Sequence, residues 1–160
     1  MAGYASSLGR EMGLSAGEQE LLRRAGLLHD VGKIGIRDAI LLKPEPLSRE
    51  EWEHIKTHPI LGERICQPLG ERALLLIIRH HHERYDGKGY PDSLAGEAIP
   101  FGARIMAIAD AYDALTSDRP HRGRFSQEQA LEIMRWEAGT QFDPVLALRF
   151  VALIEAGRLP

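Results

Sequence analysis

The sequence predicts an all-α protein, and three kinds of observation support this prediction. Segments at Ser15–Glu18, Ser48–Glu51 and Ser126–Gln129 have the pattern of capping boxes, which start helices. Between these segments, apolar residues recur every three or four positions, the spacing that keeps side chains on one face of a helix. The alternating pattern of β-strands is weak throughout the chain.

The individual helices follow from these start signals and from the apolar spacing. The first segment is short and weakly apolar, which indicates the tail of a longer helix. Gly32 is expected to end the second helix in a left-handed position. Asp143 and Pro144 predict an N-cap and a first helical residue. The predicted helices are 2–12, 18–31, 49–57, 60–68, 70–83, 100–117, 127–138 and 144–157, with an irregular stretch at 33–48.

Length and composition favour a single globular domain. The 160 residues suffice for one core. A net charge of −3 argues against a nucleic-acid binder or a binder of membrane surfaces. There is no apolar run of membrane-spanning length and no signal-peptide pattern at the start. Cys66 is the single cysteine, which excludes an intrachain disulfide and fits a cytoplasmic protein. We expect it to be a small buried residue rather than a nucleophile.

Two predicted helices carry histidines on their buried faces. The apolar stripe of helix 18–31 continues to His29, with Asp30 beside it. The stripe of helix 70–83 continues to His81, with His82 at its flank. His80 is expected to point away into solvent. A single buried histidine is usually a satisfied core residue, but an adjacent buried carboxylate generally needs a partner or a metal.

Two carboxylates fall on the close-packed face of predicted helix 100–117. Asp110 and Asp113 lie there among small residues. One buried acid could be held by backbone amides or an arginine, but together with the histidines it indicates a shared cation. Imidazole and carboxylate ligands suit iron, manganese, nickel, cobalt or zinc. The ligands outnumber the four of a tetrahedral zinc site, so we predict two metals, which generate a hydroxide nucleophile and clamp a phosphoryl group. Spacing does not choose between His54 and His58, which share a helical face.

Four ordered segments resemble the HD-GYP domain, a branch of the HD-domain metal-dependent phosphohydrolases. They are "LLHDVGKIGI" (27–36), "THPILG" (57–62), "HHERYDGKGYP" (81–91) and "RIMAIADAYDALTSDRP" (104–120). "FDP" at 142–144 also fits. The resemblance implies an all-α HD-domain helical bundle with additional C-terminal helices. It also implies hydrolysis of cyclic di-GMP to pGpG, to GMP or to both, by a hydroxide bridging two divalent metals, iron or manganese.

The resemblance assigns the site residue by residue. It selects His58 over His54 and Asp110 over Asp113, and it leaves Asp113 to support the ligands from outside. It makes Asp30 the bridging ligand and gives Asp30 and Lys33 catalytic roles, with Lys33 placing positive charge on the phosphate. The metal ligands are then His29, Asp30, His58, His81, His82 and Asp110, and the substrate contacts are Lys33, Gly89, Tyr90, Arg119 and Arg122.

The chain departs from the family pattern at two places. His121 stands where the family usually has tyrosine. A further histidine or glutamate ligand of the family, on the helix before the HD motif, would fall just before Met1. We therefore expect residues 1–160 to be a single HD-GYP domain, truncated in its first helix and excised from a larger multidomain regulator. Such a fragment would have two metals rather than three and reduced activity.

Two other functions remain open from the sequence. A generic HD nucleotide phosphohydrolase is disfavoured by the "DGKGYP" loop. A weakly active or inactive module could instead sense cyclic di-GMP or dock a partner. The expected partners are cyclic di-GMP and either a diguanylate cyclase domain or an upstream sensor or receiver domain. Neither nucleic acid nor membrane is expected, and an oligomer stays open.

Overall fold

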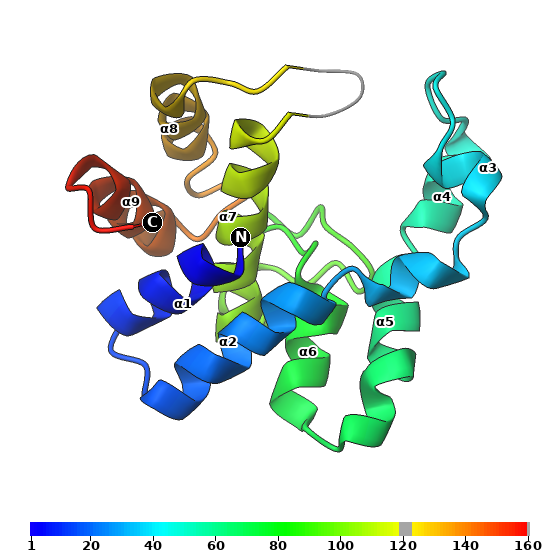
Figure 1. The fold of residues 1–160 in the computed structure, drawn as a ribbon, viewed down its shortest axis with the longest axis horizontal. Coiled ribbons are helices and arrows are strands. Elements are labelled where there is room, and N and C mark those ends of the chain that lie inside the picture. Colours follow the sequence, from blue (N-terminus) through cyan, green and yellow to red (C-terminus); the bar gives the residue numbers. More distant parts are fainter. Residues whose placement is uncertain (119–122, 160) are drawn as a thin grey trace.

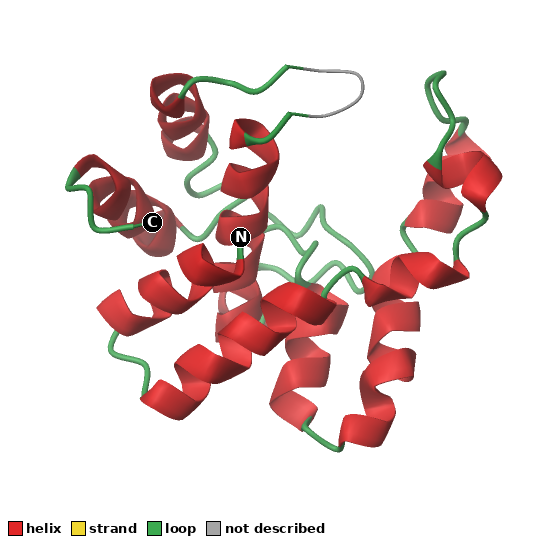
Figure 2. Ribbon diagram, in the orientation of Figure 1, coloured by secondary structure: helices red, strands yellow, loops and turns green. Residues whose placement is uncertain are grey.

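The computed structural model describes residues 1–118 and 123–159, and in these ranges the chain is built from helices and loops (Figures 1 and 2). Two isolated β-bridges, and no strand, occur among the described residues. The all-α prediction is confirmed. The elements are α1 (Ala2–Glu11), α2 (Ala16–Leu28), η1 (Val31–Gly35), α3 (Asp38–Leu41), α4 (Arg49–Ile55), α5 (His58–Cys66), η2 (Gln67–Leu69), α6 (Arg72–His80), η3 (Gly96–Ala98), α7 (Phe101–Thr116), α8 (Gln127–Trp136) and α9 (Pro144–Glu155).

The predicted helix starts are confirmed by side-chain caps. The hydroxyl of Ser15 accepts a hydrogen bond from the amide of Glu18, whose carboxylate accepts one from the amide of Ser15 at 2.8 Å. Ser48 and Ser126 begin their helices with the same reciprocal pair. The carboxylate of Asp143 accepts hydrogen bonds from the first free amides of α9. Each cap satisfies amides that have no partner within their own helix.

The predicted helices end earlier than expected, and two of them have a histidine as the C-cap. The second helix stops at Leu28 with His29 as its C-cap, and α6 stops at His80 with His81 as its C-cap. In both C-cap residues the imidazole Nδ1 faces the carbonyl oxygen three residues earlier. That carbonyl would otherwise accept an amide of the next helical turn, so the side chain competes with helix continuation. The stretch predicted as irregular also contains the short helix α3.

Gly32 has a different role from the predicted helix terminator. It lies inside η1, is buried, and is absent from the glycines with positive φ. A Cβ atom at this position would lie 1.9 Å from the carbonyl oxygen of His58 and 2.5 Å from the amide nitrogen of Gly62. Glycine is needed because η1 packs directly on the backbone of α5. This contact brings the segment after His29 against the start of α5.

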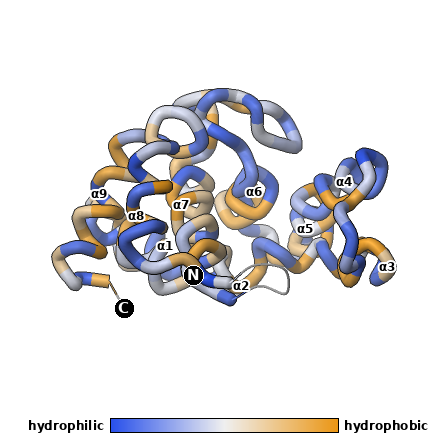
Figure 3. The backbone as a smooth tube through the Cα atoms, turned by 90° about the horizontal axis from the view of Figure 1, so that it is seen from above, coloured by the Kyte–Doolittle hydropathy of each residue, from blue (hydrophilic) through white to orange (hydrophobic). Residues whose placement is uncertain are grey.

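Helix α7 runs through the middle of the bundle (Figure 1) and packs against α1, α2, α6, α8 and α9. Its residues Ile105, Met106 and Ile108 are fully buried. Hydrophobic and hydrophilic residues alternate along the surrounding helices (Figure 3), as expected for amphipathic helices around a core. Cys66 is buried in this core, which confirms its predicted placement. The core therefore fixes α7 as the wall against which the ends of α2 and α6 are held.

Helices α3 and α4 form an arm that stands beside the bundle (Figure 1). The two helices contact each other, and α4 leads directly into α5. No described helix has the length and apolar character needed to cross a membrane. The arm matters for the site because α4 ends just before His58.

Candidate metal centre

Four predicted ligands converge in the structure. One ligand atom from each of Asp30, His58, His81 and His82 lies within 4.8 Å of the others. Nε2 of His58 is 3.3 Å from Oδ1 of Asp30. The ring centroids of His81 and His82 are 4.0 Å apart. Three chain segments meet here: the end of α2 with the start of η1, the start of α5, and the end of α6.

The other two predicted ligands extend this cluster toward α7. Nε2 of His29 is 3.5 Å from Oδ2 of Asp30 and 3.6 Å from Oδ1 of Asp110. Asp30 therefore lies between two groups, with one oxygen facing His58 and the other facing His29. The structure brings all six predicted ligands together, and His54 is outside the four-residue cluster.

Three of the histidines are oriented by the same local contact. Nδ1 of His29, His58 and His81 faces the carbonyl oxygen three residues earlier, at 3.0, 2.8 and 2.7 Å. A carbonyl oxygen only accepts hydrogen bonds, so Nδ1 carries the hydrogen in each ring. Nε2 then keeps its lone pair and faces the cluster. Such a backbone contact is the usual way in which a metal-binding histidine is held.

Several atoms of the cluster are buried without a hydrogen-bond partner in the part of the chain that the structure describes. They include Oδ1 of Asp30 and Nε2 of both His58 and His81. Leaving a buried acceptor unsatisfied costs about 1–3 kcal/mol, so such groups call for a missing partner. A metal ion between these atoms would accept one lone pair from each of them. The residues present therefore fit a metal centre.

The protonation states of His81, His82, Asp30 and Asp110 suit metal binding, whereas the pKa of His29 is raised because Asp110 and Asp30 outweigh the effect of burial. Burial, together with the neighbouring imidazoles, lowers the pKa of His82 to about 3 and that of His81 well below its usual value. Burial by itself would raise the pKa of Asp30, but the adjacent imidazoles and Lys33 outweigh it and lower the pKa. Asp110 has a lowered pKa for the same reason, with His29 opposing the effect of burial. At neutral pH His81 and His82 are uncharged and both carboxylates are ionised, the states that metals require.

Lys33 holds the second oxygen of Asp30. Its ammonium group donates a hydrogen bond to Oδ2 at 2.5 Å. The lysine follows Asp30 by three residues across η1, which sets this reach. A fixed positive charge therefore lies at the edge of the cluster, where it can also face an anionic ligand.

Tyr90 places an aromatic ring over the histidines. Its ring centroid lies 4.9 Å from that of His82 and 6.5 Å from that of His58. A Cβ atom on Gly89 would lie 2.3 Å from the amide nitrogen of Arg84, so glycine lets this loop fold tightly on itself. Burial raises the pKa of Tyr90, and the carboxylates of the cluster raise it further. The phenol is therefore protonated and can donate a hydrogen bond.

Glu83 organises the loop that carries Tyr90, a role that the sequence analysis missed. Its buried carboxylate accepts hydrogen bonds from the amides of Asp92 at 2.7 Å and Leu94 at 3.1 Å. Arg79 binds the side chain of Asp92 through two nitrogens, at 2.7 and 2.9 Å. The signal was present in the sequence, because Glu83 directly follows His82 in the quoted motif segment.

The predicted solvent exposure of His80 is wrong. Its side chain is buried, with a relative exposure of 6% for the residue. Nδ1 lies 3.4 Å from the carboxylate of Asp92 and 3.6 Å from that of Glu83. The loop after α6 folds back over this side of the helix, a long-range event that helical periodicity does not contain.

Of Asp113 and the two predicted phosphate-binding arginines, the structure describes Asp113. The carboxylate of Asp113 accepts a hydrogen bond from the amino group of Met1 at 2.8 Å and is 42% exposed. Its supporting role beside the ligands stays a prediction. Arg119 and Arg122 lie outside the described residues, so their role as substrate contacts also stays a prediction.

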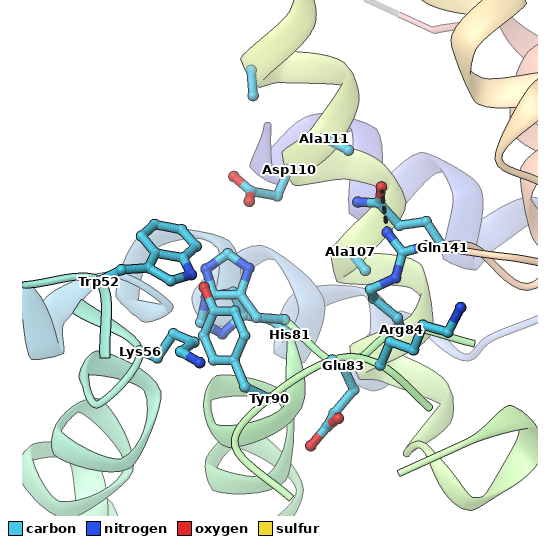
Figure 4. A pocket seen from close by; sticks show the side chains of 14 residues that line it. Trp52, Lys56, His81, Glu83, Arg84, Tyr90, Ala107, Asp110, Ala111 and Gln141 are labelled. Carbon is cyan, nitrogen blue, oxygen red and sulfur yellow. Dashed lines mark hydrogen bonds between the residues drawn. The ribbon is translucent and has the colours of Figure 1, made fainter. Parts of the chain in front are cut away.

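A cavity of about 450 Å³ opens over the cluster (Figure 4). His81, His82, Tyr90 and Asp110 line it, together with Trp52 and other residues. A second hollow of about 780 Å³ lies between the α3–α4 arm and α7. Both hollows share Ala111, Ala114 and Gln141 in their walls. Volumes of this size accommodate small-molecule ligands.

A family model described as "HD domain" matches residues 1–146. The chain belongs to the HD-domain family. This match and the relatives described below confirm the resemblance of its motifs to the HD-GYP branch, and the helical architecture confirms the predicted fold class. This HD domain carries its namesake residues as His29 and Asp30, at the junction of α2 and η1.

Curated relatives of this HD domain have names of one functional type. "Cyclic di-GMP phosphodiesterase response regulator RpfG" of Xanthomonas campestris is 43% identical over 147 residues, covering 90% of this chain and 39% of the relative. "Cyclic di-GMP phosphodiesterase" of Vibrio cholerae is 44% identical, covering 85% of this chain and 29% of the relative. "3'3'-cGAMP-specific phosphodiesterase 3" of the same species is 38% identical, covering 90% and 32%. The chain thus spans well under half of each of these relatives.

Two solved structures share the fold of this HD domain. The crystal structure of V-cGAP3, a cyclic GMP-AMP specific phosphodiesterase of V. cholerae, has a TM-score of 0.75 at 23% identity, covering 98% of this chain and 43% of that one. Bd1817, an HDG"Y"P protein from Bdellovibrio bacteriovorus, has a TM-score of 0.75 at 20% identity, covering 96% and 51%. At these identities the comparison concerns the fold, and it agrees with the all-α architecture.

Proposed function

We propose that this HD domain is a metal-dependent phosphodiesterase that hydrolyses cyclic di-GMP. The observation that carries the proposal is the buried cluster of Asp30, His58, His81 and His82, whose ligand atoms lie within 4.8 Å of one another. The free lone pairs of His58, His81 and Asp30 support metal binding rather than a closed hydrogen-bond network. The open cavity above the cluster supports access by a small-molecule substrate.

Two divalent ions, iron or manganese, are the proposed cofactors, because carboxylate and imidazole ligands suit such metals. Asp30 is the proposed shared ligand, since its two oxygens face different histidines. When bound, the ions lower the pKa of water and neutralise phosphate charge. The proposed ligand sets are Asp30, His58, His81 and His82 for one ion, and His29, Asp30 and Asp110 for the other.

The chain's own residues would bind and orient the phosphodiester. Lys33 would face a phosphate oxygen with a fixed positive charge. Tyr90 would donate a hydrogen bond, because its raised pKa keeps the phenol protonated. Gly89 would let the loop approach the substrate closely. Arg119 and Arg122 are proposed to bind the second phosphate, as in the family that the motifs resemble.

The names of relatives support cyclic di-GMP as the substrate, and they also favour a second candidate. Two of the most similar relatives are named cyclic di-GMP phosphodiesterases. Others, at 38% identity, are named as specific for 3'3'-cGAMP. Hydrolysis of 3'3'-cGAMP is therefore the second candidate activity. The turnover experiment described below would also determine whether the main product is pGpG or GMP.

We further propose that this domain works in the cytoplasm as part of a longer regulator. The matched relatives are much longer than the chain, and one of them is named a response regulator. A diguanylate cyclase domain or an upstream sensor or receiver domain is the proposed protein partner. Size measurement of the purified protein would show whether it forms an oligomer.

The decisive experiment combines metal analysis with turnover. Protein purified with and without oxygen is assayed for bound metals and for hydrolysis of cyclic di-GMP and 3'3'-cGAMP, with product identification. We expect bound iron or manganese and hydrolysis of at least one dinucleotide, lost in Asp30→Ala. Fully metal-loaded protein that hydrolyses neither compound would contradict the proposal. Tight binding without turnover would instead support a sensing module.

A further inference from the structure

Trp52 is a large aromatic side chain left half exposed over the metal centre. It lies on α4, outside the metal cluster, and is 47% exposed. It lines the same cavity of about 450 Å³ as His82, Tyr90 and Asp110. Figure 4 shows the indole and the Tyr90 ring on the same side of this cavity. An apolar face is thus kept in solvent where the proposed substrate must enter.

The chemistry of the cavity changes from its floor to this wall. The floor holds His81, His82 and Asp110, whose imidazoles and carboxylate are suited to metals, and metals in turn attract phosphate. One turn after Trp52, Lys56 adds a positive charge to the same cavity, although its ammonium also pairs with Glu53 at 2.7 Å. A ligand that fits this gradient is anionic at one end and flat and aromatic at the other. A nucleotide has both properties.

Exposure by itself does not single out Trp52. Other large apolar residues, including Ile34, Leu42 and Trp136, are more exposed, but they are not among the residues that line this cavity. Trp136 lies on α8 and is 85% exposed. It therefore offers a matched control of the same residue type. The location of Trp52 in the site wall, rather than its exposure, points to a ligand.

We propose that Trp52 is a substrate-binding residue whose indole stacks on a purine base of the cyclic dinucleotide. This inference rests on the proposed function and extends it from the phosphate to the base. Stacking on an aromatic ring tolerates any base, because every base presents a π-face. Trp52 therefore contributes similarly to binding of cyclic di-GMP and 3'3'-cGAMP and does not discriminate between guanine and adenine.

Binding affinity gives the first test. The metal-loaded protein is titrated with non-hydrolysable phosphorothioate analogues of both dinucleotides. Trp52→Ala is expected to weaken binding of each by roughly 10-fold or more, the usual range for a lost stacking contact. Trp52→Phe keeps a ring and should retain most of the affinity. Trp136→Ala should bind as the parent protein does. Equal affinity of Trp52→Ala and the parent would overturn the proposal.

Fluorescence gives a second test that leaves the site intact. The chain has two tryptophans, so Trp136→Phe makes Trp52 the single tryptophan emitter. Its emission should change saturably with the cyclic di-GMP analogue, whereas that of Trp52→Phe should not change. An unchanged signal from Trp52 while the parent protein binds the analogue would reject stacking and leave the proposed function standing. A parent protein that binds neither dinucleotide would reject the proposed function and this inference together.

Discussion

Oδ1 of Asp30 lies 3.3 Å from Nε2 of His58, and neither atom has a hydrogen-bond partner among the described residues. The other oxygen of Asp30 is held by the ammonium of Lys33 at 2.5 Å. Oδ1 thus has a free lone pair that faces the buried histidines. Oδ2, on the side of His29, is already paired with Lys33. This division makes Asp30 the residue on which both proposed metal positions depend.

Replacing Asp30 should abolish metal binding. In Asp30→Ala both proposed ions lose their shared carboxylate, and the buried imidazoles lose the charge that compensates a cation. We expect metal content and hydrolysis to fall together, with metal affinity reduced by more than about 100-fold, beyond the usual effect of residues around the ligands. Metal analysis after dialysis measures this. Full metal content in Asp30→Ala would show that Asp30 does not bridge.

Two aspartates of α7 provide a matched pair. Asp110 lies 3.6 Å from Nε2 of His29, whereas Asp113 binds the amino group of Met1. Asp110→Asn should lower the affinity for the metal at the His29 position by at least about 10-fold. Asp113→Asn should keep the metal content of the parent. Metal titration of both variants distinguishes them, and equal losses would mean that Asp113 also supports the centre.

Lys33→Gln should separate catalysis from metal binding. The lysine is proposed to supply positive charge to the substrate phosphate and is not one of the proposed metal ligands, so the variant should keep its metals. Turnover should fall roughly 100-fold or more, as when a transition-state donor is removed. Kinetics on metal-replete protein measures the fall. A variant that loses its metals would instead show that Lys33 is needed to hold Asp30 in place.

Gly32→Ala should destabilise the fold. Its Cβ would lie 1.9 Å from the carbonyl oxygen of His58, and a backbone atom cannot move away cheaply. We expect a loss of about 3 kcal/mol in the free energy of unfolding. Gly17, also helical, has no atom of the described residues within 4 Å of an added Cβ. Gly17→Ala should therefore stabilise the protein by about 0.5 kcal/mol. Denaturant unfolding compares them, and similar stabilities would refute the close packing of η1 on α5.

The ion pair between Arg79 and Asp92 should make stability depend on acid pH. Hydrogen bonds from Arg79 lower the pKa of Asp92. A lowered folded-state pKa stabilises the protein above the unfolded-state pKa, about 3.9, and this contribution disappears as pH falls through the folded value. Asp92→Asn should therefore be less stable than the parent by about 1 kcal/mol at neutral pH, because the pair is partly exposed. The difference should vanish in strong acid. A difference independent of pH would point to packing rather than charge.

Local signals predicted the helix starts and the inward placement of two histidines. The capping boxes at Ser15, Ser48 and Ser126 were correct because a cap involves residues three apart and needs no other part of the chain. The inward placement of His29 and His81 followed from apolar periodicity, which also reflects a local geometry. The choice of His58 over His54 came from the motif resemblance, since both occupy the same helical face.

Tertiary contacts determined what local patterns could not contain. His80 is buried because the loop ending near Asp92 folds back over α6, and Gly32 is needed because α5 passes within contact distance of η1. The helices end at His29 and His81 because each imidazole takes a backbone carbonyl while its other nitrogen faces the cluster. The sequence by itself determined an all-α chain with histidines and carboxylates on buried faces. The tertiary structure decided that these faces meet at one point beside α7, because only packing brings residues distant in sequence within a few ångströms of each other.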